Sequence, residues 1–173
     1  MSGKHRVFFA FVPPAPVREQ VRSVQQSIGG GGRPVRPDNF HVTLAFIGSQ
    51  PSTAIPVILD AASRLTFEQC EVVLDTVGSF RRAGVVWLGT DAVPARLAAF
   101  QSALAQSLEQ AEIPIDRKPW HFHLTLYRRL RKPPPIMHPI AIEWRLQRFS
   151  LLESVSVEKG VEYHPLGHWE ARD

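Results

Sequence analysis

A four-residue pattern of histidine, apolar residue, threonine and leucine occurs twice in this chain and constrains its fold more than any other feature. The first copy covers residues 41–44 (HVTL) and the second covers residues 123–126 (HLTL), both in apolar segments rich in strand-forming residues. Because side chains alternate between the two faces of a strand, each histidine shares a face with the threonine two residues further on. The pattern therefore predicts two half-buried strands, each presenting an imidazole beside a hydroxyl.

The opposite face of each predicted strand is apolar. Alternation assigns to this buried face Phe40, Val42, Leu44 and Phe46 in the first strand, and Phe122, Leu124 and Leu126 in the second. If only one copy of the pattern were present, its histidine and threonine could be polar residues that an exposed strand face tolerates without any function. This explanation fits the repeat poorly, because the duplication keeps the polar residues while the apolar residue between them changes. The repeat favours a site built from paired histidines and paired hydroxyls.

Apolar periodicity and turn residues divide the chain into strands, helices and loops. Strands are predicted at residues 6–12, 40–47, 71–80, 85–88, 120–128, 144–157 and 161–169, and helices at residues 17–28, 54–65 and 94–111. Three consecutive prolines predict an irregular loop over residues 131–139. The same order of elements recurs imperfectly in both halves. It predicts one α+β domain over residues 1–173, made of two pseudo-symmetric lobes of antiparallel sheet with outer helices and a central cleft.

Length and cysteine content restrict the class of protein. With 173 residues the chain is long enough for one well-buried domain. Its single cysteine, Cys70, excludes an intramolecular disulfide and fits a reducing compartment, and no segment approaches the length of a transmembrane span. We expect a cytoplasmic monomer without membrane contact.

The charge balance permits a polyanionic partner. Lysine and arginine number 20 against 16 acidic residues, and the pI is about 9.7. Ten basic residues lie in or beside the turns around the two repeated strands: Arg33, Arg36, Arg81, Arg82, Arg117, Lys118, Arg128, Arg129, Arg131 and Lys132. Solvated loops explain any single one of them equally well, so the charge distribution permits RNA as a partner without requiring it.

Paired histidines suit proton transfer on two sides of one group. An imidazole acts as acid or base near neutral pH, so one histidine can activate a nucleophile while the other protonates a leaving group. Two hydroxyls beside them can hold the equatorial oxygens of a phosphate during in-line displacement. Acyl transfer fits less well, since no serine or cysteine accompanies either histidine. The pattern indicates chemistry at a phosphodiester without a metal.

A metal site is the alternative for the same residues. His121 is predicted on the same face as His123, and His41 could complete a zinc site with them. Neither repeated strand contains an acidic residue to complete such a shell. We therefore predict no metal and no cofactor, and we place His121 at the edge of the site, where it either contacts substrate or only lines the mouth. The other four histidines are read as surface residues: His5, His138, His164 and His168.

The sequence also resembles a known family. The resemblance covers nearly the whole chain and is carried by residues 6–10, 39–48, 78–80, 86–89 and 123–128, together with Tyr163 and Trp169 near the end. These segments resemble the two-histidine (2H) phosphoesterases, and within them the bacterial and archaeal RNA 2′,3′-cyclic phosphodiesterases, also called 2′-5′ RNA ligases. The chain departs from the family pattern at Phe122, where many relatives carry proline, and at Tyr127, where small or aliphatic residues are common.

The resemblance implies an activity and roles for four residues. The reaction opens a 2′,3′-cyclic phosphate at an RNA 3′ end and leaves a 2′-phosphate. His41 would protonate the departing 3′ oxygen and His123 would activate water, while Thr43 and Thr125 would hold the phosphate oxygens. With a 5′-hydroxyl in place of water, the same groups would form a 2′-5′ phosphodiester.

Three further residues are candidates for binding the substrate. Arg128 is a candidate phosphate contact, because it lies at the end of the second repeated strand, two residues after the repeat. Phe46 and Tyr127 offer aromatic surface on which a base of single-stranded RNA could stack. Two other readings stay open: an RNA- or nucleotide-binding module without turnover, and a 2H phosphodiesterase acting on another small cyclic phosphate.

Overall fold

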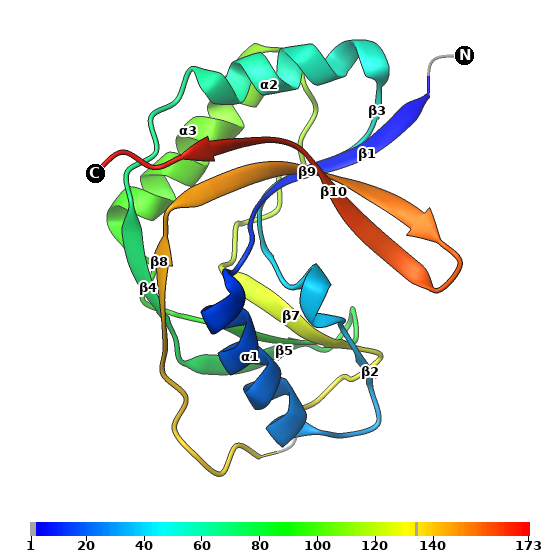
Figure 1. Ribbon diagram of the computed structural model, residues 1–173, viewed down its shortest axis with the longest axis vertical. Coiled ribbons are helices and arrows are strands. Elements are labelled where there is room, and N and C mark those ends of the chain that lie inside the picture. The colour runs from blue at the N-terminus through cyan, green and yellow to red at the C-terminus, as the bar shows by residue number, and fades with distance from the viewer. Residues whose placement is uncertain (1–2, 134) are drawn as a thin grey trace.

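The computed structural model describes residues 3–133 and 135–173, and most of its strands form one antiparallel sheet (Figure 1). The strand order is β10-β9-β1-β3-β7-β6-β5, and the short β2 adds to β7. These strands are β1 (Lys4–Phe11), β2 (Arg33–Pro34), β3 (Val42–Pro51), β5 (Thr76–Phe80), β6 (Val85–Gly89), β7 (His123–Arg128), β9 (Arg148–Val157) and β10 (Gly160–Glu170). A second, two-stranded sheet pairs β4 (Cys70–Leu74) with β8 (Ile142–Leu146).

The large sheet has two halves that meet between β3 and β7. One half contains β1, β3, β9 and β10, and the other contains β2, β5, β6 and β7. Within the described residues, β3 and β7 are paired through Val42 and Leu124. The predicted α+β class, with antiparallel sheet in two halves, is confirmed.

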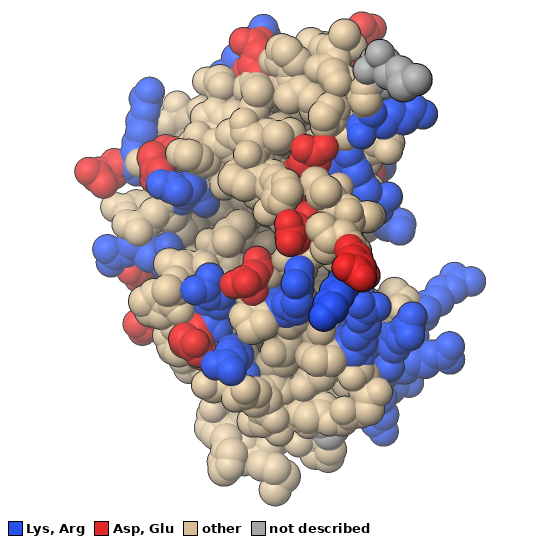
Figure 2. All heavy atoms as spheres, turned by 45° about the vertical axis from the view of Figure 1, so that its right-hand side comes forward, with Lys and Arg blue, Asp and Glu red and all other residues tan. Residues whose placement is uncertain are grey.

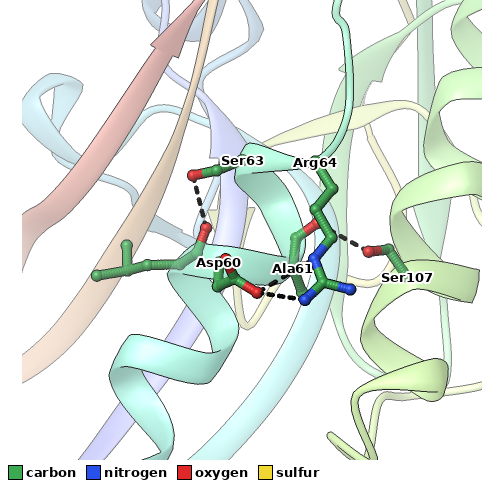
Figure 3. Close-up of polar contacts among 6 residues, drawn as sticks. Asp60, Ala61, Ser63, Arg64 and Ser107 are labelled. Carbon is green, nitrogen blue, oxygen red and sulfur yellow. Dashed lines mark hydrogen bonds and ion pairs between the residues drawn. The ribbon is translucent and has the colours of Figure 1, made fainter.

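Three α-helices cover the sheets: α1 (Ala15–Ile28), α2 (Ile55–Ser63) and α3 (Ala95–Gln110). Helices α2 and α3 lie together at one end of the molecule and α1 lies at the other (Figure 1). The Ser107 hydroxyl on α3 donates to the carbonyl of Ala61 on α2 over 2.8 Å, and Asp60 and Arg64 form an ion pair along α2 (Figure 3). None of the helices in the described parts of the chain is long and apolar enough to cross a membrane.

Helix α1 follows β1 in sequence but packs against the half that contains β7. The amide of Gln25 donates to the carbonyls of Val35 and Leu126, and the Tyr127 hydroxyl donates to the Gln25 carbonyl over 2.6 Å. The buried residues of α1 recur at helical spacing, and Gln25 takes the place that the apolar pattern gave to Val24: Val17, Val21, Gln25 and Ile28. The helix begins with a proline in its first turn and ends at Gly29, whose φ of 58° suits glycine.

Two predicted strands are each divided in the structure. The predicted strand over residues 71–80 breaks at Asp75, where the chain leaves β8 and begins to pair with β6. The predicted strand over residues 144–157 breaks at Gln147, between β8 and β9. The pairing of β4 with β8 joins segments about seventy residues apart, which is why local periodicity did not reveal either break. The described part of the 131–139 loop is irregular as predicted, and Pro134 lies outside the described residues.

Candidate functional site

Both repeated histidines are held by the same local hydrogen bond. His41 directly precedes β3 and its Nδ1 lies 2.8 Å from the Asn39 carbonyl, while His123 begins β7 and its Nδ1 lies 2.8 Å from the His121 carbonyl. A carbonyl only accepts, so Nδ1 carries the proton in each ring. Each neutral imidazole therefore presents an unprotonated Nε2 on its other side, ready to accept a proton.

Strand register brings the two repeats together. Val42 pairs with Leu124 in antiparallel order, so extending the register by one residue sets Thr125 opposite His41 and Thr43 opposite His123. These four side chains share the open face of the sheet, because Val42 and Leu124 are fully buried on the other. Within the described residues, neither threonine hydroxyl has a hydrogen-bond partner in the protein. The four form a square with pseudo-twofold symmetry.

The two strands separate immediately beyond this square. The backbone carbonyls along this edge of β3 are satisfied by groups from α3 and the loop before β7 instead of by β7. These bonds run from Trp120 Nε1 to Thr43, from Gln101 Nε2 to Leu44 and from the Asp116 amide to Phe46, over 2.9 to 3.0 Å. The divergence of β3 from β7 opens a pocket beside the square.

Two of the pockets beside the square each receive one of its histidines and one of its threonines. The first, of about 320 Å³, takes His41 and Thr125. It is basic, with Arg33, Arg36, Arg128 and Lys159 in its lining and no acidic residue. The second pocket, of about 950 Å³, takes His123 and Thr43. It carries mixed charge from Arg82, Arg117, Lys118, Glu109 and Asp116, and aromatic surface from Phe46, Phe80 and Trp120.

Aromatic rings that the sequence analysis did not assign to the site surround both imidazoles. His41 lies 5.0 Å from the ring centroids of Phe8 and Tyr163, and His123 lies 5.0 Å from Phe80. His121 packs against the Trp87 ring at 4.5 Å, behind His123. Further residues missed were Asn39, which lies two residues before His41, and Lys159, whose turn meets the site only in three dimensions.

One sequence signal could have revealed part of this aromatic wall. Gly78 pairs across the β5–β6 hairpin with Trp87, whose ring covers it. A methyl group at Gly78 would stand 2.3 Å from the indole, so no larger residue fits without displacing the ring. A glycine facing a tryptophan in a predicted hairpin indicates a close approach of this kind.

β-Bulges change the face assignment of two predicted site residues. An irregularity between β1 and β3 makes both Leu44 and Ala45 face the core, and Phe46 then faces the side that carries Thr43. The assignment of Phe46 to the buried face was therefore wrong, and its ring lines the second pocket.

The second bulge lies in β7 and makes the prediction for Tyr127 wrong. Thr125 pairs with Trp87 and Tyr127 with Val86, so Leu126 is an extra residue. Beyond it Tyr127 points inward, with only 6% of its surface exposed, and Arg128 points outward. A ring buried in this way offers no surface to a base.

Burial controls the charge of both histidines. Desolvation is the largest effect and lowers the pKa of His41 to about 4. The hydrogen bond to the Asn39 carbonyl raises this pKa, whereas the positive charges of Arg128 and His123 lower it. Burial also lowers the pKa of His123, opposed by the His121 carbonyl and aided by His121 and Arg128. Both imidazoles are neutral in the free protein at neutral pH. The positive charge of Arg128 lowers both pKa values, and that of His123 lowers the pKa of His41.

The remaining candidates lie as follows. Within residues 3–133 and 135–173, no group of three or more His, Cys, Asp or Glu side chains is arranged to hold a metal ion. Cys70 is buried in the core. His138, His164 and His168 are exposed as expected, whereas His5 is partly buried, with its ring nitrogens 2.6 Å from Glu153 and 2.9 Å from Ser52.

Comparison with known proteins finds relatives over the whole chain. The family model described as LigT like phosphoesterase matches residues 12–87. An RNA 2′,3′-cyclic phosphodiesterase of Escherichia coli is 31% identical, with 98% of each chain covered, and one of Thermus thermophilus is 31% identical over 96% of this chain and 90% of the relative. The crystal structure of E. coli LigT complexed with 3′-AMP superposes with a TM-score of 0.90 at 28% identity, covering 99% of this chain and 100% of that one.

Proposed function

Because this chain belongs to the family of LigT-like 2H phosphoesterases, we propose that it is an RNA 2′,3′-cyclic phosphodiesterase that leaves a 2′-phosphate. The Escherichia coli relative that carries this name covers 98% of the chain, and a solved relative was crystallised with 3′-AMP. The observation that carries the proposal is the square of His41, Thr125, His123 and Thr43, in which both imidazoles are held through Nδ1 and offer Nε2.

In the proposed reaction, the cyclic phosphate lies between the two pockets. Nε2 of His123 takes a proton from water, whose oxygen attacks phosphorus, and Nε2 of His41 gives a proton to the departing 3′ oxygen. The P–O3′ bond breaks as the bond to water forms, and the phosphate stays on O2′. The proton taken by His123 returns to solvent, and His41 regains one before the next turnover.

The acid must acquire its proton when substrate binds. With a pKa of about 4, His41 is neutral in the free enzyme at neutral pH. An anionic phosphodiester beside Nε2 favours the imidazolium and raises this pKa, so binding takes up a proton from solvent. The same burial that keeps His41 neutral without substrate strengthens its attraction to the phosphate.

The threonines and Arg128 stabilise the charge on the phosphate oxygens. Thr43 and Thr125 occupy the two corners of the square that lie between the imidazoles. Their hydroxyls can therefore donate hydrogen bonds to the two non-bridging oxygens of the phosphate. Arg128 influences both histidines and lines the pocket of His41, so its guanidinium neutralises charge that grows on the phosphate.

The second pocket provides room for the nucleophile. Water needs little space, but about 950 Å³ beside His123 accommodates a nucleoside with a 5′-hydroxyl, which would give 2′-5′ ligation by the same proton transfers. Phe46 and Phe80 offer stacking surface there, and His121 forms part of the wall. No step requires a metal ion.

Turnover of 2′,3′-cyclic AMP in excess EDTA tests the proposal. The expected product is adenosine 2′-phosphate, identified by phosphorus NMR, with 3′,5′-cyclic AMP left intact as the control. Adenosine 3′-phosphate would contradict the assigned leaving group. Tight binding without product would instead support a binding module, and activity lost in EDTA and restored by zinc would support the metal site.

A further inference from the structure

Arginines line a hollow at the end of the sheet that carries β7. The lining residues are Arg33, Arg82, Ala83, Gly84, Arg128, Arg129 and Arg131, around about 640 Å³, and none is acidic. We call this hollow the arginine groove. In Figure 2 the densest gathering of basic side chains stands at the lower right, where several project into solvent.

Backbone structure holds this gathering in place. Arg33 on β2 pairs with Arg128 on β7, so two of the guanidiniums start from neighbouring strands. Past β7, the Leu130 amide donates to the Gly84 carbonyl over 3.1 Å and joins this segment to the β5–β6 turn that carries Arg82. The side chain of Leu130 packs against Gly32. The groove is therefore made by three segments that are fixed to one another.

No carboxylate neutralises these arginines within the described part of the chain. Six arginines elsewhere form ion pairs with acidic side chains: Arg18, Arg22, Arg64, Arg117, Arg145 and Arg148. The five arginines of the groove form none. Gathered like charges repel one another, and a bound anion with several negative charges offsets this repulsion.

The arginine groove is continuous with the pocket of His41. Arg33 and Arg128 line both, and a methyl group at Gly160, across that pocket, would lie 3.8 Å from the Arg33 guanidinium. With Arg36 and Lys159 added, seven basic residues line the pocket of His41 and the groove, and one of them, Arg82, also lines the pocket of His123. The other 13 lysines and arginines are outnumbered by the 16 acidic residues, so the basic character of the chain resides in these seven residues.

We propose that the arginine groove holds the backbone phosphates of the RNA strand whose cyclic-phosphate end lies between His41 and His123. The inference rests on the proposed function, in which the 3′ oxygen faces His41, so the nucleotides on its 5′ side leave through the pocket that opens into the groove. Each of these nucleotides adds one phosphate, and a guanidinium pairs with phosphate through two parallel hydrogen bonds. The protein is thus built for oligonucleotide ends in preference to cyclic mononucleotides.

The test compares two substrates in the double variant Arg129→Gln/Arg131→Gln, which alters the far end of the groove and leaves the square intact. We expect kcat/KM for a short oligoribonucleotide with a 2′,3′-cyclic end to fall about tenfold, while kcat/KM for 2′,3′-cyclic AMP stays within about twofold. The slope of log(kcat/KM) against log salt for the oligonucleotide should become shallower by about 0.7 per lost phosphate contact. The control Arg96→Gln on α3 removes a positive charge from another face. It should change neither kcat/KM for the two substrates nor the salt dependence.

Two results would overturn the inference: an equal loss for both substrates, or no loss for the oligonucleotide. Fluorescence anisotropy of a labelled oligoribonucleotide with a 2′-phosphate end makes the test independent of turnover. If the wild-type protein turns over no cyclic phosphate but binds this RNA and the double variant binds it about tenfold more weakly, the groove assignment stands and the proposed activity fails. Unchanged affinity in the double variant rejects the groove whether or not the protein is an enzyme.

Discussion

Val42 and Leu124 pair directly across the junction of β3 and β7, and His41 and His123 each precede one of them. Beyond this pair the strands diverge, and their edges are satisfied by other segments. The distance between the two imidazoles is therefore set by a short stretch of ladder in which both residues are fully buried. A site of two opposed proton carriers needs such a fixed spacing.

Removing either imidazole should stop turnover without unfolding the protein. We expect His41→Gln and His123→Gln each to lower kcat for 2′,3′-cyclic AMP by at least about 10²-fold, because each removes one positioned proton-transfer group. Steady-state kinetics measures the loss, and circular dichroism confirms the fold. His168→Gln, on the exposed part of β10, is the matched control and should retain full activity. Wild-type turnover in either test variant would reject the assigned roles.

The threonine hydroxyls should act on the transition state more than on binding. We expect Thr43→Val and Thr125→Val to lower kcat by about 10²–10³-fold with a smaller change in KM, as for the loss of one donor to a developing oxyanion. Single-turnover kinetics separates the two effects. Thr53→Val, exposed in the short helix before α2, serves as the control. A rise in KM with kcat unchanged would show that the hydroxyls contribute uniform binding only.

Acidification should destabilise the fold through His41. Its pKa is about 4 in the folded protein and about 6.5 in the unfolded chain, so between these values the unfolded chain binds more protons and stability rises with pH. The free energy of unfolding should fall by up to about 3 kcal/mol as the pH drops from 6.5 through 4. Urea unfolding measures this loss, which His41→Gln should largely remove. Parallel stability curves for the variant and the wild type would contradict the lowered pKa.

Tyr127 should matter for stability and not for substrate. The Tyr127→Phe variant removes the donor to the buried Gln25 carbonyl and should cost about 1–3 kcal/mol in urea unfolding. Because the ring lies inside the core, kcat/KM for oligonucleotide and mononucleotide should both stay within twofold of wild type. Tyr163→Phe, beside His41, provides the comparison on the open face. A selective loss of oligonucleotide activity in Tyr127→Phe would show that the Tyr127 hydroxyl acts on the substrate, against its burial beside Gln25.

The spacing of apolar residues along the chain predicted the strand faces and helices that depend only on neighbouring residues. The period of two put His41 with Thr43 and His123 with Thr125, and helical spacing predicted the helices α1 and α3. The predicted faces of Phe46 and Tyr127 were wrong because each residue follows a β-bulge. The extra residue of a bulge moves the side chains that follow it to the opposite face of the strand. Nothing in the apolar sequence distinguishes Leu126 as that extra residue.

Contacts between distant segments were beyond such reasoning. The break at Asp75 and the pairing of β4 with β8 depend on segments that meet only in the folded protein. The same holds for Lys159, which reaches the pocket of His41 from the turn before β10. The basic residues were recognised as a group, but only the fold separates those along the groove from Arg117, which pairs with Glu109.

The crossing of α1 from β1 to the β7 half interlocks the two lobes. Helix α1, with Gln25 in its last turn, completes the interior of a lobe whose strands β5, β6 and β7 are synthesised much later. Neither half of the polypeptide should therefore fold alone, and fragments split between α2 and β4 should gain structure only when mixed. Such dependence on remote pairings makes folding slow relative to a helical bundle of this length. Unfolding of one lobe also removes contacts that stabilise the other. The arrangement of the two histidines should therefore be disrupted in one cooperative step.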